Sequence, residues 1–173
     1  MRLAPSGLSE TNLKGAQEAA EKACHALNLR SVTAHSELMK TPHGWKIIEL
    51  GPRIGGYRHD IYRMSYGINH IANDILIRAD ETPHIPTEVL GTTALFNIYA
   101  KKEGILSSTS GEDKVEKLAS FVNIKKSLKD GEELKFAKNN GDPVFEVTLF
   151  NADVDQLEKD IQIMEELLKI EVN

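Results

Sequence analysis

Two short segments on either side of a turn signal place the tightest constraint on the fold of this chain. Residues 31–40 and 45–50 are rich in strand-forming side chains, and the tetrapeptide TPHG, residues 41–44, stands between them. Proline fixes its own φ near the value that a type I turn needs, and glycine adopts a positive φ at little cost. The sequence therefore predicts an antiparallel hairpin with residues 42–44 as its loop.

The predicted hairpin brings two carboxylates together. A loop of three residues sets Thr41 opposite Trp45, and the same register sets Glu37 opposite Glu49. Like charges directly across an antiparallel pair destabilise it, by roughly 3 kcal/mol at a separation of about 5 Å and an effective dielectric constant of about 20. Protonation of one carboxyl, a different register, or a cation between the two would relieve this repulsion. In this register, Trp45 and Ile47 share the face of the two glutamates.

Groups that bind anions follow the second glutamate directly. Arg53 can hold a phosphate or a carboxylate with its two-pronged guanidinium, and the glycines around it let backbone amides approach an anion closely. Mg²⁺ prefers carboxylate oxygens and is often shared with substrate phosphates. The spacing of these residues is compatible with phosphoryl chemistry and equally with an exposed, solvated hairpin.

The segment HSELMKTPHGWKIIELGPRIGG, residues 35–56, resembles the carboxy-terminal half of the ATP-grasp fold of ATP-dependent carboxylate ligases. In that family one strand carries a glutamate, the next ends in Glu-x-Asn-x-Arg, and a Gly-Gly loop follows. The resemblance implies that Glu37 and Glu49 bind the Mg²⁺ or Mn²⁺ carried by ATP. It also implies that Arg53 is the catalytic contact to the phosphate or the small carboxylate substrate, and that Gly55 and Gly56 form the substrate loop.

The resemblance extends over most of the chain. Residues 5–31 resemble the helix that precedes this hairpin in the family. Residues 94–108 and the β-rich module around them resemble the carboxy-terminal domain of amino-acid ligases and of members similar to carbamoyl-phosphate synthase. The resemblance implies a ligase that activates a carboxylate as an acyl phosphate for attack by an amine or a similar nucleophile.

The sequence departs from the family pattern in two ways. Gly51 stands where the family has its asparagine ligand, so one metal contact is lost or comes from water. The amino-terminal half of the fold, with its phosphate flap, adenine hinge and lysine pair, has no counterpart. We therefore expect part of a larger ligase, inactive without the missing amino-terminal lobe. The alternative is a non-catalytic ATP-grasp remnant that serves as a binding or assembly module.

The order of the expected elements indicates an α+β fold, with antiparallel strands and flanking helices. An ATP-grasp part over residues 1–88 and a small mixed α/β module over residues 89–173 are predicted, joined by a linker over residues 79–91. The expected helices cover residues 13–27, 57–66, 69–79, 114–119 and 154–169, and the expected strands cover residues 31–40, 45–50, 92–100, 104–107, 119–124, 133–137 and 144–150, with a turn at residues 139–143.

Composition excludes several classes of protein. The net charge is -5 and no basic run stands out, which argues against a nucleic-acid surface. No apolar run approaches the length of a membrane span, and the single cysteine, Cys24, favours a reducing cytoplasm. Among the remaining side chains, we expect His35 to be a hydrogen-bonded wall of the site, Trp45 to be a packing residue and His70 to lie on the surface. No feature of the sequence indicates an oligomeric state.

Overall fold

A computed structural model of the chain describes residues 1–56, 58–136 and 143–173, and for residue 58 only the backbone. The fold is α+β with antiparallel strands, as predicted. The start of the predicted helix at residue 57 and most of the predicted turn at 139–143 lie outside the described residues.

The chain forms two compact units, one of residues 6–88 and one of residues 1–5 together with residues 89–173. The chain passes from one unit to the other between residues 88 and 89. The first five residues nevertheless belong to the second unit, because strand β1 (Arg2–Ala4) pairs with strand β4 (Thr92–Ile98). A three-residue strand is too short for an alternation pattern to reveal it in a sequence.

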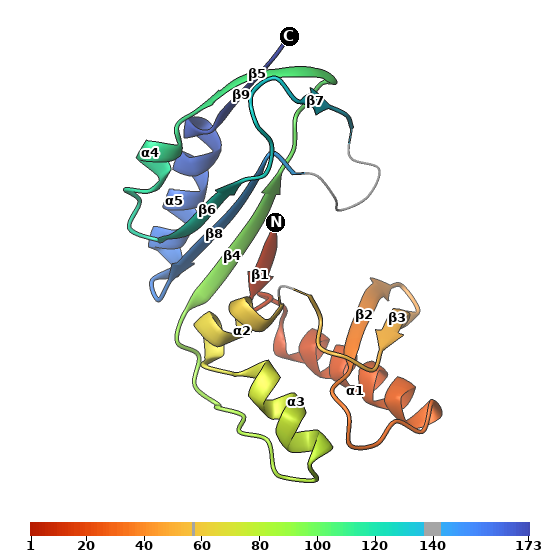
Figure 1. The fold of residues 1–173 in the computed structure, drawn as a ribbon. Helices are drawn as coiled ribbons and strands as arrows, with labels where there is room; N and C mark the ends of the chain where they lie inside the picture. The colour runs from red at the N-terminus through yellow and green to blue at the C-terminus, as the bar shows by residue number, and fades with distance from the viewer. Residues whose placement is uncertain (57, 137–142) are drawn as a thin grey trace. The chain divides into compact units, whose positions relative to one another are not determined.

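The first unit consists of a long helix, a two-stranded hairpin and two short helices (Figure 1). In chain order these elements are α1 (Glu10–Ala26), β2 (His35–Thr41), β3 (Gly44–Gly51), α2 (Arg58–Tyr66) and α3 (His70–Arg78). Helix α1 packs against the hairpin, and a Cβ built on Gly15 would lie 3.0 Å from Cδ1 of Trp45. Trp45 is therefore a packing residue, as expected, and the close approach of helix and strand depends on a glycine at position 15.

Turn-forming residues set the limits of these elements. Helix α1 begins three residues before the predicted start, directly after Ser9, and Asn28 follows it with φ 51°. Ser31 has φ 44°, so the strand predicted to start there begins only at His35. The side chain of Asn69 caps α3 by accepting a hydrogen bond of 3.0 Å from the amide of Ala72.

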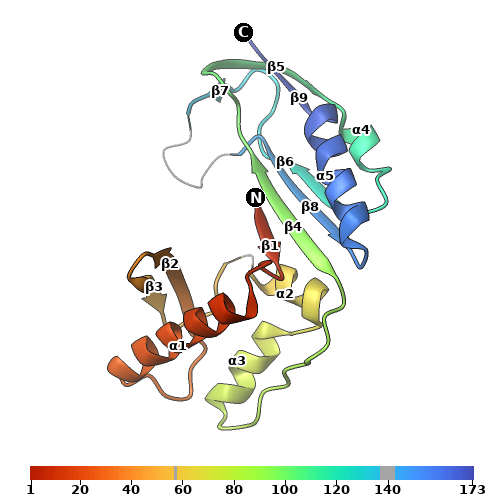
Figure 2. The same ribbon diagram turned by 180° about the vertical axis from the view of Figure 1, so that it is seen from behind.

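The second unit contains a four-stranded antiparallel sheet in the order β1-β4-β8-β6 and a three-stranded sheet in the order β7-β5-β9 (Figure 2). Its further strands are β5 (Gly104–Ser110), β6 (Phe121–Lys126), β7 (Glu133–Leu134), β8 (Phe145–Asn151) and β9 (Lys169–Val172), and its helices are α4 (Glu112–Val115) and α5 (Val154–Leu167). Alternate residues of β8 are fully buried against α5. These positions and their helical partners form the core, which includes Phe145, Val147, Leu149, Leu157 and Met164.

Three predictions for the second unit are corrected. Helix α4 begins two residues before the predicted range of 114–119 and ends at Val115, within that range, because Gly111 with φ 99° starts it. Helix α5 ends at Leu167 rather than at residue 169, and the alternating residues that follow form β9. Strand β7 ends at Leu134, short of the predicted residue 137. Within the part of the chain that the structure describes, no helix is long and apolar enough to cross a membrane.

Candidate active site

The loop of the β2–β3 hairpin is shorter than the sequence suggested. Thr41 pairs with Gly44, so the loop holds only Pro42 and His43, and Lys40 rather than Thr41 faces Trp45. The hydroxyl of Thr41 accepts a hydrogen bond of 3.1 Å from the amide of His43 and donates one of 2.8 Å to the carbonyl of Gly44. Gly44 has φ +95°, which side-chain-bearing residues rarely adopt. This glycine closes the two-residue loop.

Glu37 and Glu49 are nevertheless cross-strand partners, as predicted. The two-residue loop sets a register in which Leu38 pairs with Ile47, one residue away from the predicted register. The register then shifts between Glu37 and Leu38, where Ile48 is the extra residue of a β-bulge. The bulge thus restores the pairing of the two glutamates.

The prediction that Trp45 and Ile47 share the face of the glutamates is wrong. In the observed register, Leu38 pairs with Ile47 and Lys40 with Trp45, and directly paired residues share a face. Because side chains alternate along a strand, Glu37 points to the opposite face from Leu38. A slip of one residue moves a whole set of side chains to the other face, and the shorter loop causes such a slip here.

Each glutamate has a cationic or ionisable neighbour. The Nε2 atom of His35 lies 3.4 Å from Oε1 of Glu37, and an Nη2 atom of Arg53 lies 3.6 Å from Oε1 of Glu49. The carboxylate side chains are 50% and 58% exposed, respectively. Solvent and these neighbours screen the repulsion that the sequence alone suggested. His35 is a hydrogen-bonded side chain beside the carboxylates, as expected.

Arg53 is positioned by the chain reversal at the end of β3. Its amide donates a hydrogen bond of 2.8 Å to the carbonyl of Gly51, and its Nη1 donates one of 3.2 Å to the carbonyl of Ile54. A Cβ built on Gly51 would meet the side chain of Arg53 at 3.6 Å, which is an ordinary contact. The position that the family fills with asparagine therefore has room for a side chain in this chain.

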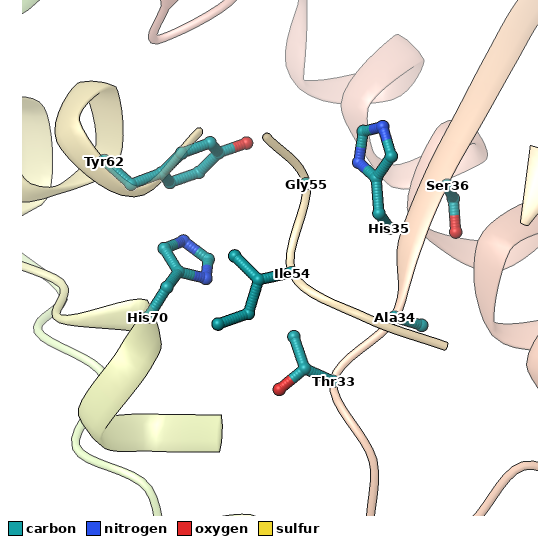
Figure 3. Close-up of a pocket in the computed structure, with 8 residues that line it drawn as sticks. All are labelled: Thr33, Ala34, His35, Ser36, Ile54, Gly55, Tyr62 and His70. Carbon is teal, nitrogen blue, oxygen red and sulfur yellow. The ribbon is translucent and has the colours of Figure 1, made fainter. Parts of the chain in front are cut away.

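A cavity of about 380 Å³ lies beside the hairpin within the first unit. Figure 3 shows Tyr62 and His70 on one side and His35 on the other, with Ile54 and Gly55 between them. Gly55 is buried and lines the cavity, whereas Gly56 is exposed and does not line it. The complete lining consists of Thr33, Ala34, His35, Ser36, Ile54, Gly55, Tyr62 and His70.

Two aromatic residues of the lining were missed or misplaced by sequence reasoning. His70 is half-buried rather than on the surface, and burial, followed by the nearby His59, lowers its pKa. The ring of Tyr62 meets that of His70 edge to face, with centroids 4.9 Å apart. The spacing of four residues predicts the stacking of Tyr62 on Tyr66 within α2. The contact of Tyr62 with His70 joins α2 to α3, and the sequence holds no local signal for it.

The donor atoms of the site suit a hard divalent cation. Two carboxylates paired across a hairpin offer oxygen ligands of the kind that Mg²⁺ prefers. Within the described residues, no group of three or more His, Cys, Asp or Glu side chains could hold a metal ion. A Mg²⁺ ion held by Glu37 and Glu49 would therefore need its remaining ligands from phosphate oxygens or water.

Comparison with known proteins gives matches among solved structures. No protein-family model and no curated protein matches the chain. An L-amino acid ligase from Bacillus licheniformis is 20% identical with a TM-score of 0.82, and its match covers 99% of this chain and 43% of that one. Phosphoribosylglycinamide synthetase from Anaerococcus prevotii is 18% identical with a TM-score of 0.76, and its match covers 99% of this chain and 44% of that one. The present chain therefore has the fold of part of an ATP-grasp ligase.

A third neighbour was solved with nucleotide. The biotin carboxylase domain of the 2-oxoglutarate carboxylase from Hydrogenobacter thermophilus was crystallised with MgADP, ADP and bicarbonate. It is 14% identical with a TM-score of 0.60, and the match covers 98% of this chain and 38% of that one. The present chain thus spans less than half the length of these ATP-grasp proteins, consistent with a carboxy-terminal portion.

Proposed function

We propose that the chain is the carboxy-terminal part of an ATP-dependent carboxylate ligase. The observation that carries this proposal is the pairing of Glu37 with Glu49 across a bulged hairpin, with Arg53 beside Glu49. A chain of this fold with a merely structural role would have no need for two carboxylates in direct opposition. The similarity to ATP-grasp ligases supports the same function.

In this proposal, Glu37 and Glu49 hold the Mg²⁺ of ATP, and Mn²⁺ can replace it. The bound Mg-ATP supplies the phosphoryl group that converts the substrate carboxylate to an acyl phosphate, which an amine or a similar nucleophile then attacks. Arg53 binds the substrate carboxylate or the transferring phosphate through its guanidinium. The amides of the loop at Gly55 and Gly56 approach the substrate.

Arg53 exchanges partners when substrate binds. In the structure its guanidinium lies 3.6 Å from Glu49, and both side chains are more than half exposed, so this ion pair contributes little stability. A cation bound between Glu37 and Glu49 would neutralise Glu49 and free the guanidinium for an incoming anion. The ion pair is thus a resting arrangement of the same groups.

Metal-dependent melting of the 173-residue chain tests the site. Mg²⁺ or Mn²⁺ should stabilise the native state by mass action, by roughly 0.6 kcal/mol at a concentration about twice the dissociation constant. The double variant Glu37→Gln with Glu49→Gln should lose this response. The matched control is Glu133→Gln, which removes a carboxylate that is 64% exposed and paired with Lys135 at 3.0 Å. A metal response that persists in the double variant would rule out the assignment of both ligands.

A further inference from the structure

The cavity beside the hairpin is lined by uncharged or weakly basic groups. None of its eight lining residues is Asp, Glu, Lys or Arg. Its volume of about 380 Å³ lies in the range of small-molecule sites. A fully charged ligand group would lose its hydration there without gaining an ion-pair partner from the lining, and this loss is costly.

Two buried polar atoms of the lining, Oγ1 of Thr33 and Nε2 of His70, have no hydrogen-bond partner within the described residues. An unsatisfied buried polar atom is unfavourable, and in native structures such atoms are usually paired with protein, water or ligand. Burial also lowers the pKa of His70, which keeps the ring neutral at physiological pH. A neutral imidazole suits a neutral hydrogen-bonding partner.

Tyr62 gives this side of the cavity a fixed shape. Its ring packs edge to face on His70 at 4.9 Å and stacks on Tyr66 with centroids 5.5 Å apart. Figure 3 shows the side chain of Tyr62 extending from α2 toward Gly55, with its hydroxyl at that end. The cavity therefore presents two hydrogen-bonding groups, the Tyr62 hydroxyl and the His70 ring, on one aromatic wall.

The cavity continues directly from Arg53 along the chain, since the next two residues, Ile54 and Gly55, line it. We propose that the cavity is the specificity pocket for the carboxylate substrate, and that it accepts an uncharged side group ending in an amide or a hydroxyl, hydrogen bonded to His70 Nε2. This inference rests on the proposed function, which gives Arg53 the substrate carboxylate. It adds the class of substrate and names Tyr62 and His70 as specificity-determining residues.

A titration of the 173-residue chain with three probes tests the pocket. L-glutamine carries a terminal amide, L-glutamate is nearly isosteric but charged, and L-methionine is of similar length but apolar. Binding is followed by ligand-observed saturation-transfer NMR without nucleotide. We expect L-glutamine to bind roughly ten-fold or more tightly than either of the others, because a site built to hydrogen bond a ligand rejects analogues that lack the group. Equal binding of the three probes, or no binding of L-glutamine, would overturn the proposal.

Variants of the aromatic wall locate the interaction. His70→Phe keeps a ring but removes both nitrogens, and it should abolish the preference for L-glutamine over L-methionine. His70→Gln restores a polar group and should recover part of the preference. His25→Phe is the matched control, because His25 is an exposed histidine on α1 that does not line the cavity. An unchanged preference in a folded His70→Phe protein would refute the role of His70.

The titration that tests the pocket is independent of the melting experiment that tests the metal site. The probes require no cation, and the metal-dependent melt uses no amino acid. Absence of the glutamine preference in the wild-type chain, together with an intact metal response, would overturn the pocket and leave the metal site standing. If Tyr62→Phe weakens glutamine binding while Tyr66→Phe does not, the hydroxyl that lines the cavity is the one involved, since Tyr66 is outside the lining.

Discussion

Glu37 is the cross-strand partner of Glu49, although the loop that joins their strands sets a register one residue away from that pairing. The extra residue that reconciles the two registers is Ile48, which is 63% exposed. Bulges bend a strand and re-aim its side chains, and they are frequent next to active sites. The carboxylate pair is therefore a product of a local irregularity rather than of a regular ladder.

The tight loop depends on Gly44, and replacing it should destabilise the chain. We expect Gly44→Ala to lower the free energy of unfolding by about 1–2 kcal/mol, because its φ of +95° strains any residue with a Cβ. No atom lies within 4 Å of the Cβ that would be added, so the cost is conformational and not steric. Chemical denaturation measures the change.

Gly56→Ala is the matched control for this prediction. Gly56 also has no atom within 4 Å of a built Cβ, but its φ is outside the left-handed region. Its replacement should leave the free energy of unfolding within about 0.5 kcal/mol of the wild-type value. Equal losses in the two variants would mean that the positive φ at residue 44 does not hold the loop.

The missing family ligand at position 51 can be restored. Gly51→Asn should strengthen binding of Mg²⁺, because it adds an amide oxygen at the end of the strand that carries Glu49. The structure allows this side chain, since a Cβ at residue 51 meets only the Arg53 side chain, at 3.6 Å and beyond. A larger metal-induced rise in Tm than that of the wild type is the expected result.

Gly51→Ala separates the new ligand from the effect of adding a Cβ. It should melt like the wild type with and without Mg²⁺, apart from a small gain from the reduced freedom of the unfolded chain. If Gly51→Asn and Gly51→Ala respond equally to the metal, position 51 does not face the cation and the alignment of this motif with the family is wrong.

The sequence was most informative about features that depend on residues close together in the chain. The hairpin, the cap at Asn69 and the left-handed Asn28 follow from local residue preferences, and each is present. The carboxylate pair is present as well, but a bulge produces it and not the predicted loop. The register of the loop was wrong because Pro42 and Gly44 are compatible with a loop of two or three residues. In the sequence, the two successive apolar residues Ile47 and Ile48 break the alternation at the bulge, and in the structure Ile48 and Glu49 are both exposed.

Long-range features could not be derived from the chain in the same way. The pairing of β1 with β4 joins segments about ninety residues apart, and no local pattern specifies such a pairing. The cavity likewise combines residues that precede β2, that follow β3 and that lie on two helices. His70 was expected on the surface because no local pattern marks it as buried, whereas it packs against Tyr62 and lines the cavity together with Ile54.

The half-buried His70 should make the stability of the chain depend on pH. Its pKa in the folded state lies below 6.5, first because of burial and second because of His59. Between that lowered pKa and about 6.5, the unfolded chain binds more protons at this residue than the folded chain does. The free energy of unfolding should therefore fall as pH drops below about 6.5, and His70 should contribute no pH dependence above it.

Urea denaturation between about pH 5 and pH 7.5 measures this dependence. The fall at low pH should be smaller in His70→Phe than in the wild type, because the variant has no proton to take up at this site. His25→Phe, at an exposed position, should retain the full fall. The carboxyl of Asp74 does not interfere, since the Arg78 guanidinium lowers its pKa further from this window. A wild-type slope in His70→Phe would show that other groups cause the dependence.

Arg53→Lys distinguishes a catalytic role of Arg53 from a structural one. The test needs an enzyme that contains this chain together with an amino-terminal lobe. Lysine keeps the positive charge but lacks the fork of the guanidinium, so Arg53→Lys removes bidentate recognition alone. If Arg53 holds charge that develops on the acyl phosphate, turnover should fall by roughly one to three powers of ten. The metal-dependent melting shift should persist, because Glu37 and Glu49 are unchanged.

Arg78→Lys is a close control for Arg53→Lys. Arg78 also pairs with a carboxylate four residues earlier, Asp74 at 2.8 Å, and its side chain is 54% exposed against 59% for Arg53. Arg53→Lys should change the free energy of unfolding by at most about 0.5 kcal/mol, because both partners of its ion pair are exposed. Arg78→Lys should cost more, because the carboxylate of Asp74 is only 19% exposed. Only Arg53→Lys should reduce kcat, since Arg78 pairs with Asp74 on α3 and not with a glutamate of the proposed metal site. Steady-state kinetics beside melting curves measures both quantities, and equal turnover in the two variants would assign Arg53 a surface role only.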